Sequence, residues 1–130
     1  MTAPFQSIAQ CLAFYRNCNP ARMRSINLLE QERSNKPQYG AFDERHPARI
    51  WSAIVNAIVA TECRHTVAMV QVWRAYDVAR SCAVCDIANR IGKSERTVWN
   101  WLQKMRDDFE KECIQRHLLE RYDKEKRFDD

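Results

Sequence analysis

Glycine and proline are scarce in this chain of 130 residues, which contains two glycines and four prolines. Sandwiches, barrels and meanders depend on tight turns, and these two residues form such turns most readily. Their scarcity argues against an all-β architecture and favours helices. Because 45% of the residues are hydrophobic and 29% are charged, the chain can bury a core of its own. We therefore expect a small all-α fold.

Signals for membranes and secretion are also missing. The chain has no run of about 18 apolar residues, the length at which a spanning helix becomes a candidate. Its first residues, MTAPFQSIAQ, lack the basic start and apolar block of a secretory signal. We therefore expect a cytoplasmic protein with no membrane partner, in which the six cysteines stay reduced.

The usual catalytic motifs do not occur. The sequence contains no G-x-S-x-G, no H-E-x-x-H and no glycine-rich phosphate loop. His46, His65 and His117 have no serine, cysteine or carboxylate partner at a suggestive spacing. We therefore expect that the protein is not an enzyme.

Two pairs of residues have the spacing of zinc ligands. Cys82-x-x-Cys85 lies 16 residues after Cys63-x-His65, and together they make a formal set of four ligands. However, both pairs fall inside predicted helices and lack the glycine-rich knuckle that usually presents thiolates. Cys85 is also predicted to face the core as a small apolar residue. We expect no cofactor, with zinc as the alternative.

The N-terminal part is predicted to hold two helices and a linker. Apolar residues recur at helical spacing over residues 5–16, where Ser7 can start the first turn, and a second helix covers residues 21–33. The polar string from Ser34 to His46 contains a proline and the first glycine, as linkers often do. Residues 1–46 are thus an N-terminal helical region followed by a linker.

Residues 47–120 are predicted to form a helical bundle, and residues 121–130 a charged tail. Pro47 can occupy the first turn of a third helix with a wide apolar stripe. Thr61 is expected to cap a fourth helix. The apolar positions of this fourth helix are Val67, Val70, Trp73 and Tyr76.

Residues 82–106 have the spacing of a helix-turn-helix. Small Ala88 would let two helices approach closely, and Gly92 would supply the left-handed turn between them. Ser94 can cap the second helix, whose inward positions are Val98, Trp101 and Leu102. Five residues fit the helix-turn-helix geometry: Ala88, Gly92, Ser94, Val98 and Trp101. The alternative interpretation is an ordinary helical hairpin.

The second helix of this motif would expose a face suited to DNA. Arg, Asn and Gln have the donor and acceptor geometry to contact base edges, whereas Lys104 and Arg106 suit phosphates. Trp99 on this face is unusual, and it would contact DNA or dock a protein partner. The candidate DNA-binding residues are Lys93, Ser94, Glu95, Arg96, Trp99, Asn100, Gln103, Lys104 and Arg106.

The segments around this motif resemble a known class of DNA-binding domain. They are Arg74-Ala-Tyr-Asp-Val-Ala-Arg80, Asp86-Ile-Ala-Asn-Arg-Ile, Ser94-Glu-Arg-Thr-Val-Trp and Leu102. This pattern resembles the promoter-reading C-terminal domain of sigma factors and the small Q-type antitermination proteins of lambdoid phages. Lys93 departs from the pattern, because an apolar residue is common there. The resemblance covers residues 66–110. It implies a protein that binds DNA near a late promoter and makes RNA polymerase, with its sigma factor, read through terminators.

Several functions remain open at this point. A DNA-binding transcription regulator is favoured, with antitermination as its most specific form, and a conventional phage repressor or a packaging module as other DNA-directed forms. A protein-binding adaptor that acts on a host regulator is the alternative from another class. The second helix of the motif is predicted to continue to about residue 120. Its apolar stripe would pack on Trp73 and Tyr76 or form a homodimer seam. The stripe consists of Leu102, Met105, Phe109, Cys113 and Leu118.

Overall fold

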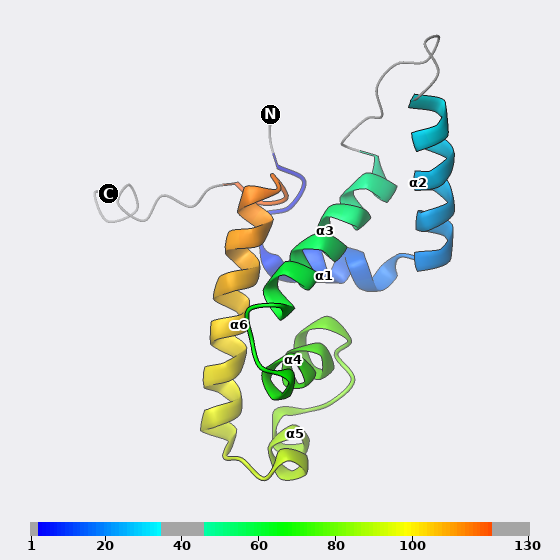
Figure 1. Cartoon of the computed structure of the whole chain (residues 1–130). Coiled ribbons are helices and arrows are strands. Elements are labelled where there is room, and N and C mark those ends of the chain that lie inside the picture. The colour runs from blue at the N-terminus through cyan, green and yellow to red at the C-terminus, as the bar shows by residue number, and fades with distance from the viewer. Residues whose placement is uncertain (1–2, 35–45, 121–130) are drawn as a thin grey trace, which may run out of the picture.

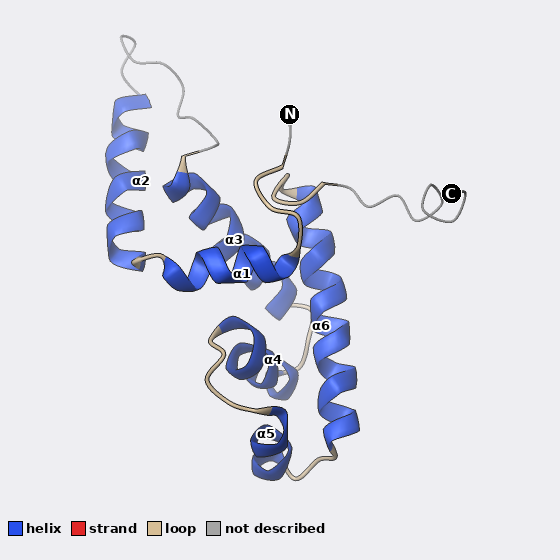
Figure 2. Cartoon of the chain, turned by 180° about the vertical axis from the view of Figure 1, so that it is seen from behind, coloured by secondary structure: helices blue, strands red, loops and turns tan. Residues whose placement is uncertain are grey.

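The computed structural model describes residues 3–34 and 46–120. In this part of the chain every regular element is helical and no strand is present, which confirms the all-α prediction (Figure 2). The elements are α1 (Ile8–Asn17), α2 (Pro20–Ser34), α3 (Pro47–Glu62), α4 (Val67–Trp73), the π-helical segment η1 (Arg74–Val78), α5 (Val84–Ile91) and α6 (Glu95–Gln115).

Side chains before the first turn fix where several helices begin. The hydroxyl oxygen of Ser7 accepts a hydrogen bond from the backbone N–H of Gln10, so Ser7 starts α1 as predicted. The helix begins at Ile8, however, and not at Phe5. The N–H of Phe5 donates to the carbonyl of Leu118 at 3.2 Å, which holds the segment before α1 against the end of the described chain. Pro47 occupies the first turn of α3, also as predicted.

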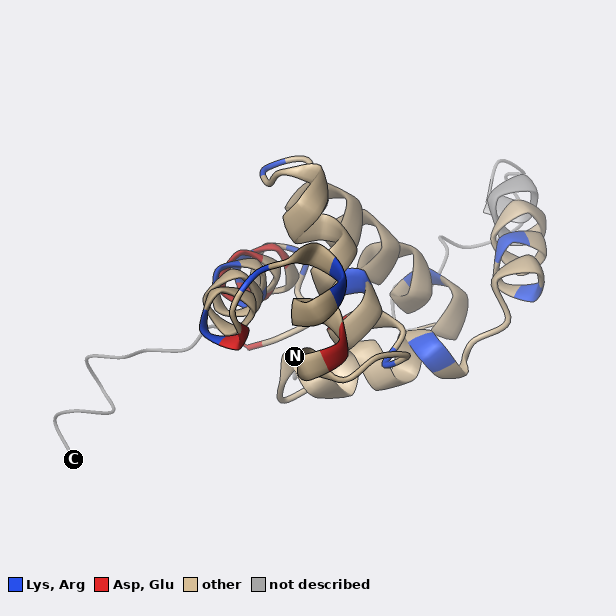
Figure 3. Ribbon diagram, turned by 90° about the horizontal axis from the view of Figure 1, so that it is seen from below, with Lys and Arg blue, Asp and Glu red and all other residues tan. Residues whose placement is uncertain are grey.

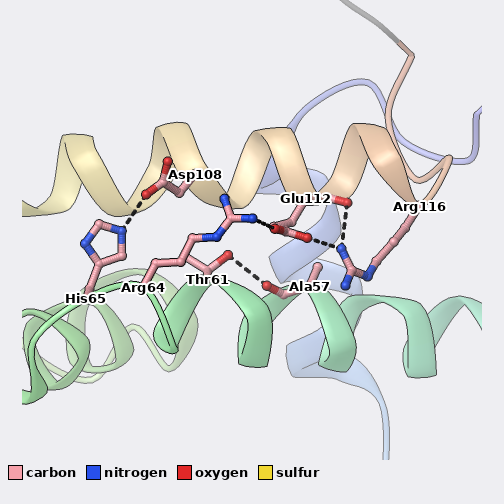
Figure 4. Close-up of polar contacts among 7 residues, drawn as sticks. All are labelled: Ala57, Thr61, Arg64, His65, Asp108, Glu112 and Arg116. Atoms are coloured by element: carbon pink, nitrogen blue, oxygen red, sulfur yellow. Dashed lines mark hydrogen bonds and ion pairs between the residues drawn. The ribbon is translucent and has the colours of Figure 1, made fainter.

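The predicted start of the fourth helix is wrong. Thr61 lies inside α3, fully buried, and its hydroxyl donates to the carbonyl of Ala57 at 2.8 Å (Figure 4). The cap of α4 is Thr66, whose backbone is extended and whose hydroxyl oxygen accepts from the N–H of Met69. Val67 is also wrongly assigned to the apolar stripe of this helix, because it is exposed.

Helix α6 is the longest element and lies against α3 and α4 (Figure 1). The rings of Trp73 and Phe109 meet with their centroids 5.3 Å apart, so the predicted packing of α6 on Trp73 is confirmed. The apolar stripe of this region is buried within the chain and cannot form a homodimer seam. All five of its residues are 2% exposed or less: Leu102, Met105, Phe109, Cys113 and Leu118.

Helix α6 is shorter than the sequence predicted. It ends at Gln115 and not near residue 120, because His117 has a φ of 61° and turns the chain. The N–H of Leu118 then donates to the carbonyl of Cys113 at 2.9 Å, which closes the helix end.

The N-terminal helices differ in how they join the core. Cys11 and Leu12 of α1 are buried in the same cluster as the α6 stripe. Helix α2 extends away from this cluster and lies beside α3, where Asn27 donates to the carbonyl of Ala48 and to the hydroxyl of Ser52 (Figure 1). The predicted linker over residues 34–46 lies mostly outside the described residues, and the charged tail lies entirely outside them.

Candidate nucleic-acid interface

The α5–α6 unit, residues 84–115, is built around the turn at Gly92. This glycine has a φ of 68°, in the left-handed region, and the N–H of Lys93 donates to the carbonyl of Ala88 at 3.1 Å. Ser94 then caps α6, because its hydroxyl oxygen accepts from the N–H of Thr97 at 3.1 Å. Both predictions for this turn are confirmed. The turn therefore sets the orientation of α6 relative to α5.

The inner face of the unit is apolar and buried. Ile87 and Ala88 of α5 and Val98 and Leu102 of α6 are at most 4% exposed. Trp101 is half-buried and packs against the same cluster. The inward positions predicted from the sequence are therefore correct, and the opposite side of α6 is left to solvent.

The exposed face follows from the helical repeat. At about 100° per residue, Arg96, Asn100 and Gln103 lie within about 60° of one another around the α6 axis. Trp99 and Arg106 flank this strip on one side, and Lys104 flanks it on the other. Eight of the nine predicted DNA-binding residues are exposed in the structure: Lys93, Ser94, Glu95, Arg96, Trp99, Asn100, Gln103 and Lys104.

The cations of this face differ in whether they are already paired. Within the described chain, the side chains of Lys93, Arg96 and Lys104 make no hydrogen bond or ion pair. Gln103 donates to the carboxylate of Asp107 at 2.9 Å, which occupies part of its side-chain amide. Seen from the end where α5 and α6 meet, the ribbon of α6 carries both basic and acidic segments (Figure 3). These three unpaired cations lie at the turn before α6 and in the first half of the helix.

Arg106, which is predicted to contact phosphate, is already paired within the chain. Its Nε and Nη2 atoms donate to the two carboxylate oxygens of Asp77, each at 2.8 Å, and its side chain is 29% exposed. This two-pronged pairing raises the pKa of the Arg106 guanidinium. No local sequence pattern indicates this pair, because 29 residues separate its members.

Trp99 is also held by the chain itself. Its ring meets the ring of Tyr76 edge to face, with centroids 5.3 Å apart, and the side chain keeps 43% of its surface exposed. The guanidinium carbon of Arg106 lies 5.8 Å from the Tyr76 ring centre and 5.9 Å from that of Trp99. Tyr76, Asp77, Trp99 and Arg106 thus form one edge cluster, in which the ring of Trp99 packs on that of Tyr76.

The π-helical segment that presents Tyr76 and Asp77 is supported from α1. A guanidinium nitrogen of Arg16 donates to the carbonyl of Asp77 at 2.8 Å and is 3.4 Å from that of Val78. Burial, followed by the nearby charge of Arg80, lowers the pKa of Arg16. Sequence reasoning missed Arg16 and Asp77, because π-helical turns have no recognised residue pattern to reveal them.

A second set of polar contacts joins α6 to the turn that follows α3 (Figure 4). Buried Glu112 forms ion pairs with Arg64, at 2.7 Å, and with Arg116. The imidazole Nε2 of His65 lies 2.6 Å from a carboxylate oxygen of Asp108. These contacts lie beyond Lys104, so they fix the C-terminal half of α6 and leave its N-terminal half unobstructed.

The four formal zinc ligands do not come together as a site. His65 is paired with Asp108, and no three His, Cys, Asp or Glu side chains in the described ranges are arranged to hold a metal. Two details of the prediction are wrong. Cys63 and Cys82 lie in the segments before α4 and α5 and not inside helices, and Cys85 is exposed instead of facing the core.

The chain matches no protein-family profile, no curated protein and no solved structure. Across residues 3–34 and 46–120, no helix combines the length and apolar character needed to cross a membrane.

Proposed function

We propose that this protein binds duplex DNA through the α5–α6 unit, used as a helix-turn-helix, and that it regulates transcription. The observation that carries the proposal is the contrast between the two sides of α6. Val98 and Leu102 are buried, whereas Arg96 and Asn100 are exposed on successive turns between the unpaired cations Lys93 and Lys104.

The dimensions of this face suit a major groove. From Arg96 to Lys104 the helix rises about 12 Å, close to the width of the major groove of B-DNA. Arg96 can form two hydrogen bonds with guanine, and Asn100 can do the same with adenine. Lys93 and Lys104 lie where the phosphates that border the groove would run.

The available charge is modest, because Glu95 lies among these cations and Asp77 neutralises Arg106. Each phosphate contact contributes to affinity, so a face with so few free cations should bind DNA weakly on its own. A larger assembly would supply the missing contacts. Antitermination together with RNA polymerase, the narrower form of the proposal, is supported only by the resemblance of residues 66–110 to sigma-factor and Q-type domains.

Selection of bound sequences from a random duplex pool, followed by titration of the selected duplex, tests the proposal. Arg96→Ala should weaken binding by about 1–3 kcal/mol and relax the preference at one base pair. Lys104→Ala should weaken binding to all sequences and reduce the salt dependence by about one phosphate contact. Lys111→Ala is the matched control, because Lys111 is an exposed lysine farther along α6 among acidic residues.

A pool from which no sequence is enriched, together with unchanged binding by Arg96→Ala and Asn100→Ala, would refute DNA recognition. A protein-binding adaptor would then be the better account. The exposed, prearranged Trp99 favours that alternative, because Trp, Tyr and Arg are the residues most enriched at the centres of protein interfaces. Loss of partner binding by Trp99→Ala would support it.

A further inference from the structure

The pair formed by Asp77 and Arg106 lies at the edge of the proposed DNA-binding face. Arg106 follows Trp99 by seven residues, which places the two side chains within about 20° of each other around the α6 axis. Trp99 is exposed at this edge, and Arg106 lies against both Trp99 and Tyr76. A strand of DNA that passes along this edge would therefore meet an arginine that is already paired.

The chemistry of the pair is the chemistry of a phosphate contact. A guanidinium donates two parallel hydrogen bonds to a carboxylate or, in the same way, to a phosphate. Asp77 uses both of its oxygens to accept these bonds, at 2.8 Å each, and its side chain is 11% exposed. Arg106 cannot offer the same two N–H groups to Asp77 and to DNA at once.

We propose that Asp77 is a positioning residue that competes with DNA phosphate for Arg106 and so keeps duplex binding weak. The inference rests on the proposed function. When Asp77 loses its charge, Arg106 becomes free to contact one more phosphate along the edge next to Trp99. Arg16 holds the backbone of Asp77 and not its carboxylate, so an asparagine at this position can keep the local fold.

The test measures binding of a labelled 20-base-pair duplex of mixed sequence. Asp77→Asn should bind it about threefold to tenfold more tightly than the parent at low salt. Because one more phosphate is contacted, the slope of log K against log salt should steepen by about 0.9. Between 50 and 200 mM salt, the advantage should therefore shrink about threefold to fourfold.

The chain offers a closely matched control. Glu62 is an acidic residue with the same 11% side-chain exposure, and it pairs with Arg74 on the same π-helical segment. Glu62→Gln raises the net charge by the same amount as Asp77→Asn, but it frees an arginine that reaches toward α3. The Glu62→Gln variant should bind the duplex with the same affinity as the parent protein. The gain from Asp77→Asn should also vanish when Arg106→Gln is added.

A measurement on the parent protein tests the inference even if Asp77→Asn fails to fold. When the mixed-sequence duplex is added, the Nε–H signal of Arg96 should move in the NMR spectrum, whereas that of Arg106 should stay in place. An equal shift of both signals would overturn the inference, as would equal affinities of Asp77→Asn and Glu62→Gln. These results leave the proposed function intact, whereas a failure of every variant to bind duplex would overturn both.

Discussion

Replacing Gly92 by alanine isolates the cost of the turn between α5 and α6. The φ of 68° at Gly92 lies in the region that L residues rarely adopt. A Cβ atom built at this position meets no atom within 4 Å, so the substitution creates no clash. Any destabilisation must therefore come from the backbone conformation alone.

The expected magnitude follows from two opposing effects. A left-handed conformation costs an L residue about 1–2 kcal/mol. Alanine also restricts the unfolded chain more than glycine does, which offsets about 0.4–1 kcal/mol of this cost. We therefore expect Gly92→Ala to lower the free energy of unfolding by about 1 kcal/mol. Gly92→Asn should cost less, because asparagine tolerates this region better.

Urea unfolding followed by circular dichroism at 222 nm measures the effect. The natural comparison is His117, which ends α6 with a φ of 61° although it is not a glycine. His117→Gly should be neutral or stabilise the protein by up to about 1 kcal/mol, the opposite of Gly92→Ala. An alanine at position 92 that stabilised the chain, as in a continuous helix, would refute the left-handed turn.

Three further perturbations test the core and its charges. Interaction with the Cys11 thiol, together with burial, raises the pKa of the Cys113 thiol, so the folded state keeps a proton that the unfolded state loses above about pH 9.0. The free energy of unfolding should therefore fall above that pH by about 1.4 kcal/mol per pH unit. Urea titrations at pH 8 to 10 measure this dependence, which Cys113→Ala should flatten. An unchanged slope in the variant would contradict the raised pKa of Cys113. Glu112→Gln should lower the free energy of unfolding, measured by thermal unfolding, by about 1–3 kcal/mol, because it leaves Arg64 and Arg116 without their carboxylate. The control Glu110→Gln, at an exposed residue, should change it by less than about 0.5 kcal/mol. Trp73→Ala should lower the free energy of unfolding by about 3–5 kcal/mol, because Trp73 is fully buried. If Trp99→Ala, at a half-exposed residue, lowered it by as much, the central place of Trp73 in the core would be contradicted.

Features of the fold that depend on local chemistry were predictable from the sequence. The turn at Gly92 and the cap at Ser94 were correctly predicted, because each residue acts on backbone groups within a few positions. The burial of Val98 and Leu102 followed from the helical repeat. The failure at Thr61 is also local. A threonine can cap a helix or bond to the carbonyl four residues back inside one, and the sequence contains a second threonine five residues later.

Most contacts between distant segments were not predictable, although the packing of α6 on Trp73 was. The pairing of Arg106 with Asp77 and the packing of Trp99 on Tyr76 require η1 to lie beside α6, which no spacing in the sequence specifies. For the same reason His65, noted as a zinc ligand, pairs instead with Asp108, 43 residues away. The candidate face was therefore predicted as a set of exposed residues, without the contacts that decide which of its cations are free.

The most direct test of the central claim is to map where duplex DNA contacts the chain. Backbone amide signals of the isotopically labelled protein should be followed by NMR while a 20-base-pair duplex is added. The account predicts that the shifted signals cluster at the turn after α5 and along the first half of α6, from Lys93 to Lys104, and fade as salt is raised. No shifts, or shifts centred on α2 and α3, would contradict it.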